Sequence, residues 1–505
     1  MADEQREKKK FGERVKQWHA RVTHKDDPHY ISGKEARRIA RENFRITRDY
    51  EKKKRRHVDE SEYLSEMKNP ENILEIDDLR TYFFTDAGVA KSVDGVSFEV
   101  PKSSVVGVVG ESGCGKSVTS LSVMQLVQAP QGQIVGGSIR FASQDYQRDE
   151  AGKPIPIWVY EETGAQAQRT EPVLDKKGEP VTDKKTGTPL VRLTGATFTV
   201  AEGEKVVCIE PATDKKGRPV TDKDGKTQLY RLVQAKDGNG FPAFEMVDKV
   251  YDIAKMPTSA MQRIRGKEIS MIFQEPMTSL NPLFTIGNQL DEVVLLHTPG
   301  ADKELAKNRS IEMLQLVGIA MPENVYNCYP HELSGGMRQR VMIAMALACN
   351  PKLIIADEPT TALDVTIQAQ VLDLLKEIKD KINGSIMLIT HDLGVIAGMA
   401  DYVVVMYAGR IIEKGTVEDI FDRPMHPYTI GLQKSKPVIN KDVDTLYSIH
   451  GQVPNPIDMP DYCYFKDRCD DCIARCDGEY PPLVQVSPTH FVACYRAQEN
   501  KEGKA

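Results

Sequence analysis

The sequence VVGVVGESGCGKSVTSLSVMQLV (residues 105–127) joins an apolar run, a glycine-rich loop and a helical pattern. Its centre, GESGCGKS (110–117), fits the pattern G-x-x-x-x-G-K-S/T. Glycines in this pattern let backbone N–H groups surround a phosphate, and the following helix adds its positive N-terminal end. Lys116 would contact the β- and γ-phosphates, and the Ser117 hydroxyl would ligate Mg²⁺. The stretch therefore predicts a buried strand that leads into a nucleotide phosphate site.

Two neighbouring acids follow a second apolar run, LIIADE (353–358). A buried strand that ends here would deliver Asp357 toward the metal and Glu358 toward the attacking water. Gln274 follows a similar run in IFQEP, and His391 follows one in LITHD. Because strand-like runs alternate with helical patterns from about 265 to 425, we predict a mostly parallel α/β sheet.

A second glycine-rich segment, LSGGMRQR (333–340), contains Ser334, Gly335 and Gly336 at the start of another helical pattern. A serine and two glycines at a helix N-terminus are again an arrangement that binds anions.

The composition is that of a soluble globular protein with 505 residues, 40% hydrophobic and 28% charged. No apolar run approaches the roughly 18 residues that span a bilayer, and the N-terminus has no signal-peptide core. We therefore expect a cytosolic chain in which disulfides are disfavoured. The net charge of -6 conceals a basic N-terminal arm, because residues 1–60 carry 19 Lys and Arg against 12 Asp and Glu.

An internal repeat interrupts the predicted α/β unit. EPVLDKKGEPVTDKKTGTPLVRL (171–193) is repeated as EPATDKKGRPVTDKDGKTQLYRL (210–232). The turn-forming DKKG segments and the short β-type runs favour a compact β-rich insertion, with a disordered linker as the alternative. The chain therefore divides into five predicted parts: a basic helical extension (1–70), the first α/β part (71–142), the insertion (143–252), the second α/β part (253–425) and a cysteine-rich C-terminal region (426–505).

In the basic extension, Phe11, Val15 and Trp18 recur at helical spacing, and Ser32 with Glu35 predicts the start of a second helix. The extension is either a solvated appendage or a segment that docks on anionic lipid headgroups.

The order of these motifs resembles that of ATP-binding cassette (ABC) ATPases: phosphate loop, Q-loop (Gln274), LSGG signature, Walker B strand (353–358), D-loop (TTALD, 360–364) and H-loop (His391). The resemblance covers residues 73–142 and 253–425. It implies a P-loop NTPase cassette with a RecA-like core, a helical subdomain and an antiparallel β subdomain. The insertion is not part of the family pattern.

QEPMTSLNP (274–282), ALDVTIQAQVL (362–372) and HPYTIGL (426–432) resemble the ATP-binding subunits of bacterial oligopeptide/dipeptide importers. That family implies ATP hydrolysis that drives peptide uptake. Alternatives are a soluble ABC ATPase acting on ribosomes or nucleic acid, a redox enzyme centred on the cysteines, or an importer for nickel or glycosides.

Residue roles follow from the resemblance. Lys116 and Ser117 would bind phosphate and Mg²⁺, and Asp357 would hold the metal through water. Gln274 would sense the metal, Glu358 would act as the general base, and His391 would contact the γ-phosphate. The positions expected to bind nucleotide are Phe83, which would stack on adenine with Tyr82 and Phe84 as alternatives, Gly110, Glu111, Ser112, Gly113, Cys114, Gly115, Lys116, Ser117, Val118, Gln274, Asp357, Ser334, Gly335 and Gly336.

The resemblance also implies partners. Two cassettes would pack head to tail, so that Ser334, Gly335 and Gly336 close over ATP held by the other subunit, which we expect to be a paralogue. The remaining partners would be two transmembrane permease subunits and an extracytoplasmic peptide-binding protein, with no nucleic acid. The chain would then lie peripherally on the cytoplasmic face of the membrane.

Four cysteines occur in CYFKDRCDDCIARC (463–476), and Cys494 follows. The spacing of Cys463, Cys469, Cys476 and Cys494 resembles a pattern that holds a 4Fe–4S cluster in some of these subunits. Zinc is an alternative, because Cys469 and Cys472 form a typical half-site, and free thiols are another. Because the segment after Pro454 has little apolar content, we expect the metal to fix its loops.

Overall fold

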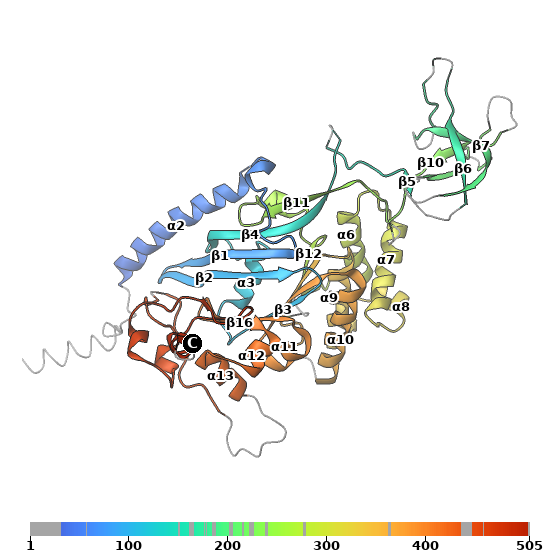
Figure 1. The fold of residues 1–505 in the computed structure, drawn as a ribbon. Helices are drawn as coiled ribbons and strands as arrows, with labels where there is room; N and C mark the ends of the chain where they lie inside the picture. Colours follow the sequence, from blue (N-terminus) through green and yellow to red (C-terminus); the bar gives the residue numbers. More distant parts are fainter. Residues whose placement is uncertain are drawn as a thin grey trace, which may run out of the picture.

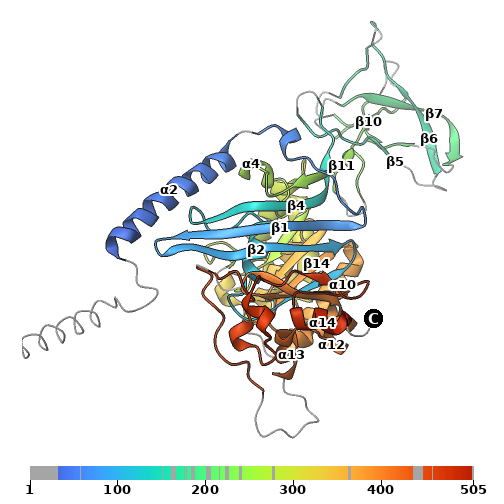
Figure 2. The same ribbon diagram turned by 60° about the vertical axis from the view of Figure 1, so that its left-hand side comes forward.

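The computed structural model describes most of the chain, and Figures 1 and 2 show its arrangement. The described residues are 32–502 apart from 57, 150–151, 161–165, 176, 178, 184–187, 201–205, 215–216, 222–226, 238–240, 276–278, 362–364, 436–446 and 458. The predicted helix containing Phe11, Val15 and Trp18 lies outside these residues. Among the described residues, no helix combines the length and apolar character needed to cross a membrane.

The centre of the molecule is an eight-stranded mixed sheet. The first five strands in sheet order are parallel, and the last three continue it in antiparallel pairing. Every residue of β3, β13 and β14 is buried, as expected for a parallel sheet covered on both faces. In sheet order the strands are β12 (Ile269–Ile272), β13 (Leu353–Asp357), β14 (Ser385–Thr390), β3 (Val105–Val109), β15 (Tyr402–Tyr407), β16 (Arg410–Thr416), β18 (Phe491–Val492) and β17 (Val484–Gln485).

Helices surround this sheet and connect its strands. The P-loop helix α3 leaves the sheet after β3, and α9 precedes β13. Four helices pack against one another and against the core, and we call them the helical subdomain: α6 (Ile286–His297), α7 (Lys303–Leu316), α8 (Pro322–Tyr326) and α9 (Gly335–Leu347). The others are α3 (Lys116–Val123), α4 (Thr258–Met261), α10 (Val365–Ile382), α11 (Leu393–Met399), α12 (Val417–Asp422), α13 (Pro427–Lys434), α14 (Tyr495–Glu502) and the 3-10 turns η1 (Glu60–Glu62), η2 (Pro330–Glu332), η3 (Lys466–Arg468) and η4 (Ala474–Asp477).

A second, antiparallel sheet lies beside the core (Figure 2). Its order is β11 (Met246–Asp252), β4 (Gly132–Tyr146), β1 (Asn72–Thr85) and β2 (Gly88–Pro101). The helix α2 (Gly33–Arg55) runs along this subdomain, and its predicted start is confirmed because Ser32 Oγ accepts the Glu35 N–H at 3.2 Å.

The insertion leaves the antiparallel sheet through two adjacent strands. The β4–β11 ladder continues to the pair Tyr146–Met246, so the chain departs near 147 and returns near 245 rather than at 143 and 252. We call residues 147–245 the inserted module. Its strands form a sheet of β6 (Gln166–Pro172), β7 (Leu190–Thr199), β10 (Tyr230–Leu232) and β9 (Ile209–Pro211), and a pair of β5 (Val159–Tyr160) and β8 (Val206–Val207).

Four hairpins in the inserted module share the sequence D-x-x-G-x-P, at 149–154, 175–180, 214–219 and 237–242. In each, the aspartate carboxylate accepts the backbone N–H of the residue four positions later, at 2.8–3.0 Å. The aspartate N–H donates to the carbonyl of that same residue. Two of the four hairpins lie outside the two predicted copies, 171–193 and 210–232, so the repeating unit is smaller than the sequence comparison indicated.

One hairpin of the module contacts the helical subdomain. The Phe241 side chain is buried with Val294 of α6, Ala306 of α7 and Ala348. The Arg309 guanidinium lies 5.3 Å from the Phe241 ring centroid. This apolar contact ties the inserted module to the helical subdomain as well as to the antiparallel sheet.

Candidate nucleotide site

The phosphate loop adopts a conformation that requires glycine at two positions. A Cβ at Gly110 (φ 153°) would lie 2.3 Å from the Met406 carbonyl oxygen, and one at Gly115 (φ 101°) would lie 2.4 Å from that of Ser92. Lys116 is buried, and its ammonium donates to the carbonyl oxygens of Gly110 and Glu111 at 2.8 and 3.0 Å. The lysine is therefore folded back onto the loop in which a phosphate would be held.

Asp357 faces the phosphate loop from the end of β13. Ser117 Oγ donates to Asp357 Oδ1 at 3.0 Å, and Ser120 Oγ lies 3.4 Å from Oδ2. Burial raises the pKa of Asp357, and the hydrogen bond from Ser117 opposes this effect. The Ser117 hydroxyl and this buried carboxylate form an oxygen donor set suited to Mg²⁺, whose charge would favour the ionised carboxylate.

Glu358 lies next to this pair and is held by three side chains. Gln274 Nε2 donates to Glu358 Oε2 at 2.9 Å, and Thr361 Oγ1 donates to the same oxygen at 2.9 Å. His391 Nδ1 lies 3.3 Å from Glu358 Oε1. Glu358 has a left-handed backbone (φ 47°), which is uncommon for a residue other than glycine and is found at functional sites. A carboxylate fixed in this way can accept a proton from water.

Two groups of predicted nucleotide contacts lie on other elements. Ser334 caps α9 by accepting the Met337 N–H at 3.3 Å, so Gly335 and Gly336 begin a helix of the helical subdomain. Phe83 lies in β1, where a Cβ on Gly132 would come within 2.9 Å of its ring. The adenine contact of Phe83 stays a prediction, and D-loop positions 362–364 are outside the described residues.

The C-terminal region reaches the phosphate loop, a contact that no sequence motif predicts. Arg468 Nη1 and Nη2 donate to the two Glu111 carboxylate oxygens at 2.8 and 3.1 Å, and the arginine side chain is only 7% exposed. The Glu111 N–H donates to the hydroxyl of the fully buried Tyr428, from the HPYT segment. No local pattern connects positions 111 and 468, so only the tertiary structure reveals this contact.

Cys114 belongs to the loop but faces the core. Its side chain is fully buried, and burial raises the pKa of the thiol. We therefore expect thiol reagents to modify Cys114 slowly even without nucleotide, although its position in the loop alone predicts a nucleotide-protected reactive cysteine.

The C-terminal cysteines lie close to one another. Burial raises the pKa of Cys463 to about 11, and nearby Cys476 and Cys494 act in the same direction. Burial raises the pKa of Cys469 to about 12, with contributions from Cys494 and Cys463. Within the part of the chain that the structure describes, no group of three or more His, Cys, Asp or Glu side chains is arranged as a metal site.

We expected little apolar packing in the segment after Pro454, but some of its side chains are buried. Tyr464 and Phe465 are buried in the main hydrophobic core, and β17 and β18 extend the central sheet. The loops around the cysteines are therefore anchored by side-chain packing as well as by any metal.

The P-loop, the paired acids at the end of β13 and the helical subdomain define an ABC ATPase cassette. An ABC transporter family model matches residues 93–177 and 225–361, and a model described as oligopeptide/dipeptide transporter, C-terminal region, matches 412–476. The chain belongs to the family of oligopeptide/dipeptide transport ATP-binding proteins.

Three curated relatives illustrate this membership. The oligopeptide transport ATP-binding protein AppD of Bacillus subtilis is 40% identical over 85% of this chain and 97% of its own length. The oligopeptide transport ATP-binding protein OppD of Bacillus subtilis is 38% identical over 83% of this chain and 87% of its own length. The dipeptide transport ATP-binding protein DppD of Lactococcus lactis is 51% identical over 50% of this chain and 72% of its own length.

Proposed function

We propose that this chain binds and hydrolyses ATP to power the import of oligopeptides or dipeptides through separate transmembrane permease subunits. The observation that carries the proposal is the Glu358 carboxylate, held by Gln274, Thr361 and His391 beside the Ser117–Asp357 pair. Glu358 would accept the proton of the attacking water, while Lys116 and bound Mg²⁺ would stabilise the charge on the transferred phosphoryl group.

The site needs a second cassette. Ser334, Gly335 and Gly336 lie at the N-terminus of α9, where backbone N–H groups point out of the helix. We assign them to ATP held by a partner cassette, a paralogue of this chain. ATP binding at both sites would close the pair, and hydrolysis would reopen it.

An apolar groove between the core and the helical subdomain suits the permease. The cavity measures about 280 Å³ and is lined by Met271, Phe273, Leu280, Leu296 and Met342, among others. Leu296 is 73% exposed although it is a large apolar side chain. A helix from a permease loop would cover this surface. The chain would then lie peripherally at the cytoplasmic face of the membrane, and an extracytoplasmic binding protein would deliver the peptide.

Replacing Glu358 with glutamine in the assembled transporter tests the proposal. Glutamine keeps the shape but cannot accept the proton, so we expect ATP turnover and peptide uptake to fall by at least about a hundredfold while ATP still binds. Glu377→Gln, at an exposed position of α10, is the matched control and should retain native turnover. Near-native turnover in the Glu358 variant would contradict the assignment.

We also propose that Cys463, Cys469, Cys476 and Cys494 hold a 4Fe–4S cluster. Four neighbouring thiols are the donor set that such a cluster requires, although their present arrangement is not that of ligands. Cys472 is exposed and is not part of the proposed set. The cluster would hold the loops from Cys463 to Cys494 together.

Anaerobic purification tests the cluster. The protein should be brown, with about four irons per chain as the proposed cluster requires. Serine at any of the four positions should remove the colour, and Cys472→Ser is the control that should not. Colourless anaerobic protein with one bound zinc would favour the zinc alternative.

A further inference from the structure

Helix α2 has two chemically different faces. Its sequence contains ten Lys and Arg residues but only four Asp and Glu. The inward face is fixed to the antiparallel sheet: Asn43 Nδ2 donates to the Thr85 carbonyl oxygen at 2.8 Å, and Gln133 Nε2 donates to Glu51 Oε1 at 2.8 Å. Asn43 and Thr47 are buried there. The helix is therefore anchored in one rotational setting.

This setting turns a row of cations to the outside. Successive members are three or four residues apart, apart from the adjacent Phe44 and Arg45, so they share one helix face. Phe44 is 66% exposed in the middle of the row. Among the described residues, no carboxylate forms an ion pair with the five cations of the row. We call this row the α2 cationic stripe; its members are Arg37, Arg41, Phe44, Arg45, Arg48 and Lys52.

Part of the stripe borders a hollow. A cavity of about 480 Å³ lies between α2 and Pro130, and its cationic lining residues are Arg48, Lys52, Arg55 and Arg56. Glu51 is the acid in this lining, and it already pairs with Lys54 and Arg55. The hollow has the charge and the open shape to accept the phosphate of a lipid headgroup.

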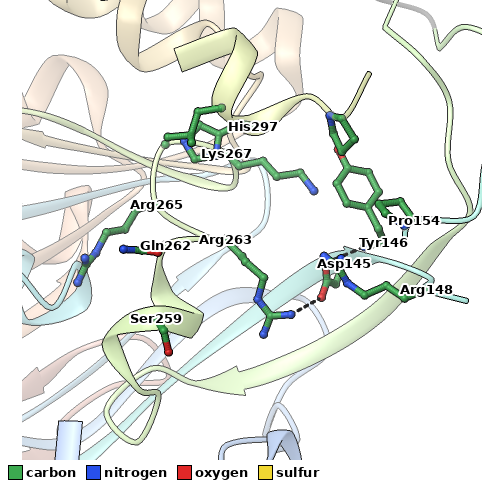
Figure 3. Close-up of a pocket in the computed structure, with 13 residues that line it drawn as sticks. Asp145, Tyr146, Arg148, Pro154, Ser259, Gln262, Arg263, Arg265, Lys267 and His297 are labelled. Carbon is green, nitrogen blue, oxygen red and sulfur yellow. Dashed lines mark hydrogen bonds and ion pairs between the residues drawn. The ribbon is translucent and has the colours of Figure 1, made fainter. Parts of the chain in front are cut away.

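The stripe is connected to the apolar groove proposed for the permease. Helix α2 lies beside α4, and Ser259 of α4 lines a cavity of about 800 Å³ (Figure 3). That cavity is also rich in cations, namely Arg148, Arg263, Arg265 and Lys267, with Asp145 paired to Arg263. It shares Gly266, Leu296 and His297 with the permease groove. This second cavity thus borders both α4, which lies beside α2, and the groove proposed for the permease.

We propose that the α2 cationic stripe binds a membrane surface rich in anionic phospholipid, with Phe44 inserted at the headgroup level. Charge complementarity and the exposed aromatic side chain both fit such a surface. The preference for lipid over nucleic acid rests on the proposed function, because a groove that receives a permease helix places the neighbouring stripe near the bilayer. The stripe would orient the cassette under its permease.

Vesicle co-sedimentation of the full chain, without permease subunits, tests the proposal. Native protein should bind vesicles of phosphatidylglycerol and phosphatidylcholine in equal parts, and should not bind pure phosphatidylcholine. Raising the salt concentration should weaken binding, since the attraction is screened. Arg41→Glu/Arg48→Glu should weaken binding at least about tenfold, and Phe44→Ala about fivefold.

The matched control is Lys376→Glu/Lys381→Glu, which makes the same charge change on the exposed face of α10. It should bind vesicles like the native chain. Equal loss in this control, or no loss in the α2 variant, would overturn the proposal, as would tight binding to duplex DNA with no vesicle binding. ATP turnover, measured separately in detergent with the permease subunits, should be the same in both double variants as in the native protein. If the native protein itself does not hydrolyse ATP, this would count against the proposed function and not against the stripe.

Discussion

The inserted module and the C-terminal region after β16 are both additions to the cassette, but they connect to it in different ways. The C-terminal region extends the central sheet, buries Phe465 in the main core and places Arg468 on the phosphate loop. The module consists of hairpins and short strands that pair mainly with one another, and Phe241 is its buried contact with the helical subdomain. Contacts with the core and the phosphate loop make the first addition part of the nucleotide site, whereas contacts within the module leave the second largely separate from it.

The largest effect on stability should come from the buried contact of Phe241 with the helical subdomain. Phe241→Ala removes a buried ring from the cluster with Val294 and Ala306, so we expect a loss of about 3 kcal/mol in the unfolding free energy of the helical subdomain. Urea denaturation and hydrogen exchange in α6 and α7 measure it. Leu174→Ala, at a side chain 49% exposed in another hairpin, is the control and should change little. If both variants lose the same amount of stability, contacts other than that of Phe241 also join the module to the cassette.

A second variant tests the link from the C-terminal region to the nucleotide. Arg468→Gln leaves the Glu111 carboxylate unneutralised beside the phosphates, so ATP affinity should fall about tenfold. Arg475→Gln removes a neighbouring cation that lies over the Tyr495 ring, and it should retain native affinity.

Adding Glu111→Gln to Arg468→Gln should restore most of the ATP affinity, because the unpaired charge is then gone. If the double variant binds ATP as weakly as Arg468→Gln alone, the arginine supports the loop through packing and not through charge.

Within the module, effects should be small and local. Asp214→Ala removes the carboxylate that accepts the Arg218 N–H, and should destabilise that hairpin by about 1 kcal/mol. Arg218→Ala removes only the exposed ion pair with Asp214, and should cost less than about 0.5 kcal/mol. Hydrogen exchange of the hairpin amides distinguishes the Asp214 variant from the Arg218 variant. Faster exchange in β13 in either variant would contradict the expectation that each hairpin is stabilised mainly by its own contacts.

The smallest effect on nucleotide binding is expected from removing nearly the whole module. With residues 148–243 replaced by a short Gly/Ser linker, the β4–β11 ladder is retained, and ATP affinity should stay within about twofold of the native value. The loss of cassette stability should match that of Phe241→Ala. Failure of the shortened chain to fold would show that the module contributes to the cassette core.

Sequence patterns predict the part of the site that depends on local chemistry. The P-loop and the acids at the end of β13 follow from glycine spacing and apolar runs, and in the structure the Ser117 hydroxyl donates to Asp357, which Glu358 follows directly in the chain. Arg468 could not be found in this way, because its partner is 357 positions distant and neither residue belongs to a pairing motif. The two outer hairpins were missed because they share only Asp, Gly and Pro with the inner pair. The buried contact of Phe241 was not predicted, because charged and polar residues and glycines (236–240) precede it in the sequence.

The return of the chain at Met246 opposite Tyr146 has a consequence for engineering and for evolution. Because paired antiparallel strands hold these ends about 5 Å apart, the cassette presents a ready attachment point at the tip of β4 and β11 for any domain whose own termini are adjacent. A fluorescent protein or an affinity domain with neighbouring ends could be grafted there without stretching the sheet. The same geometry explains how a lineage could acquire, enlarge or lose a module at this tip while the nucleotide site stays unchanged.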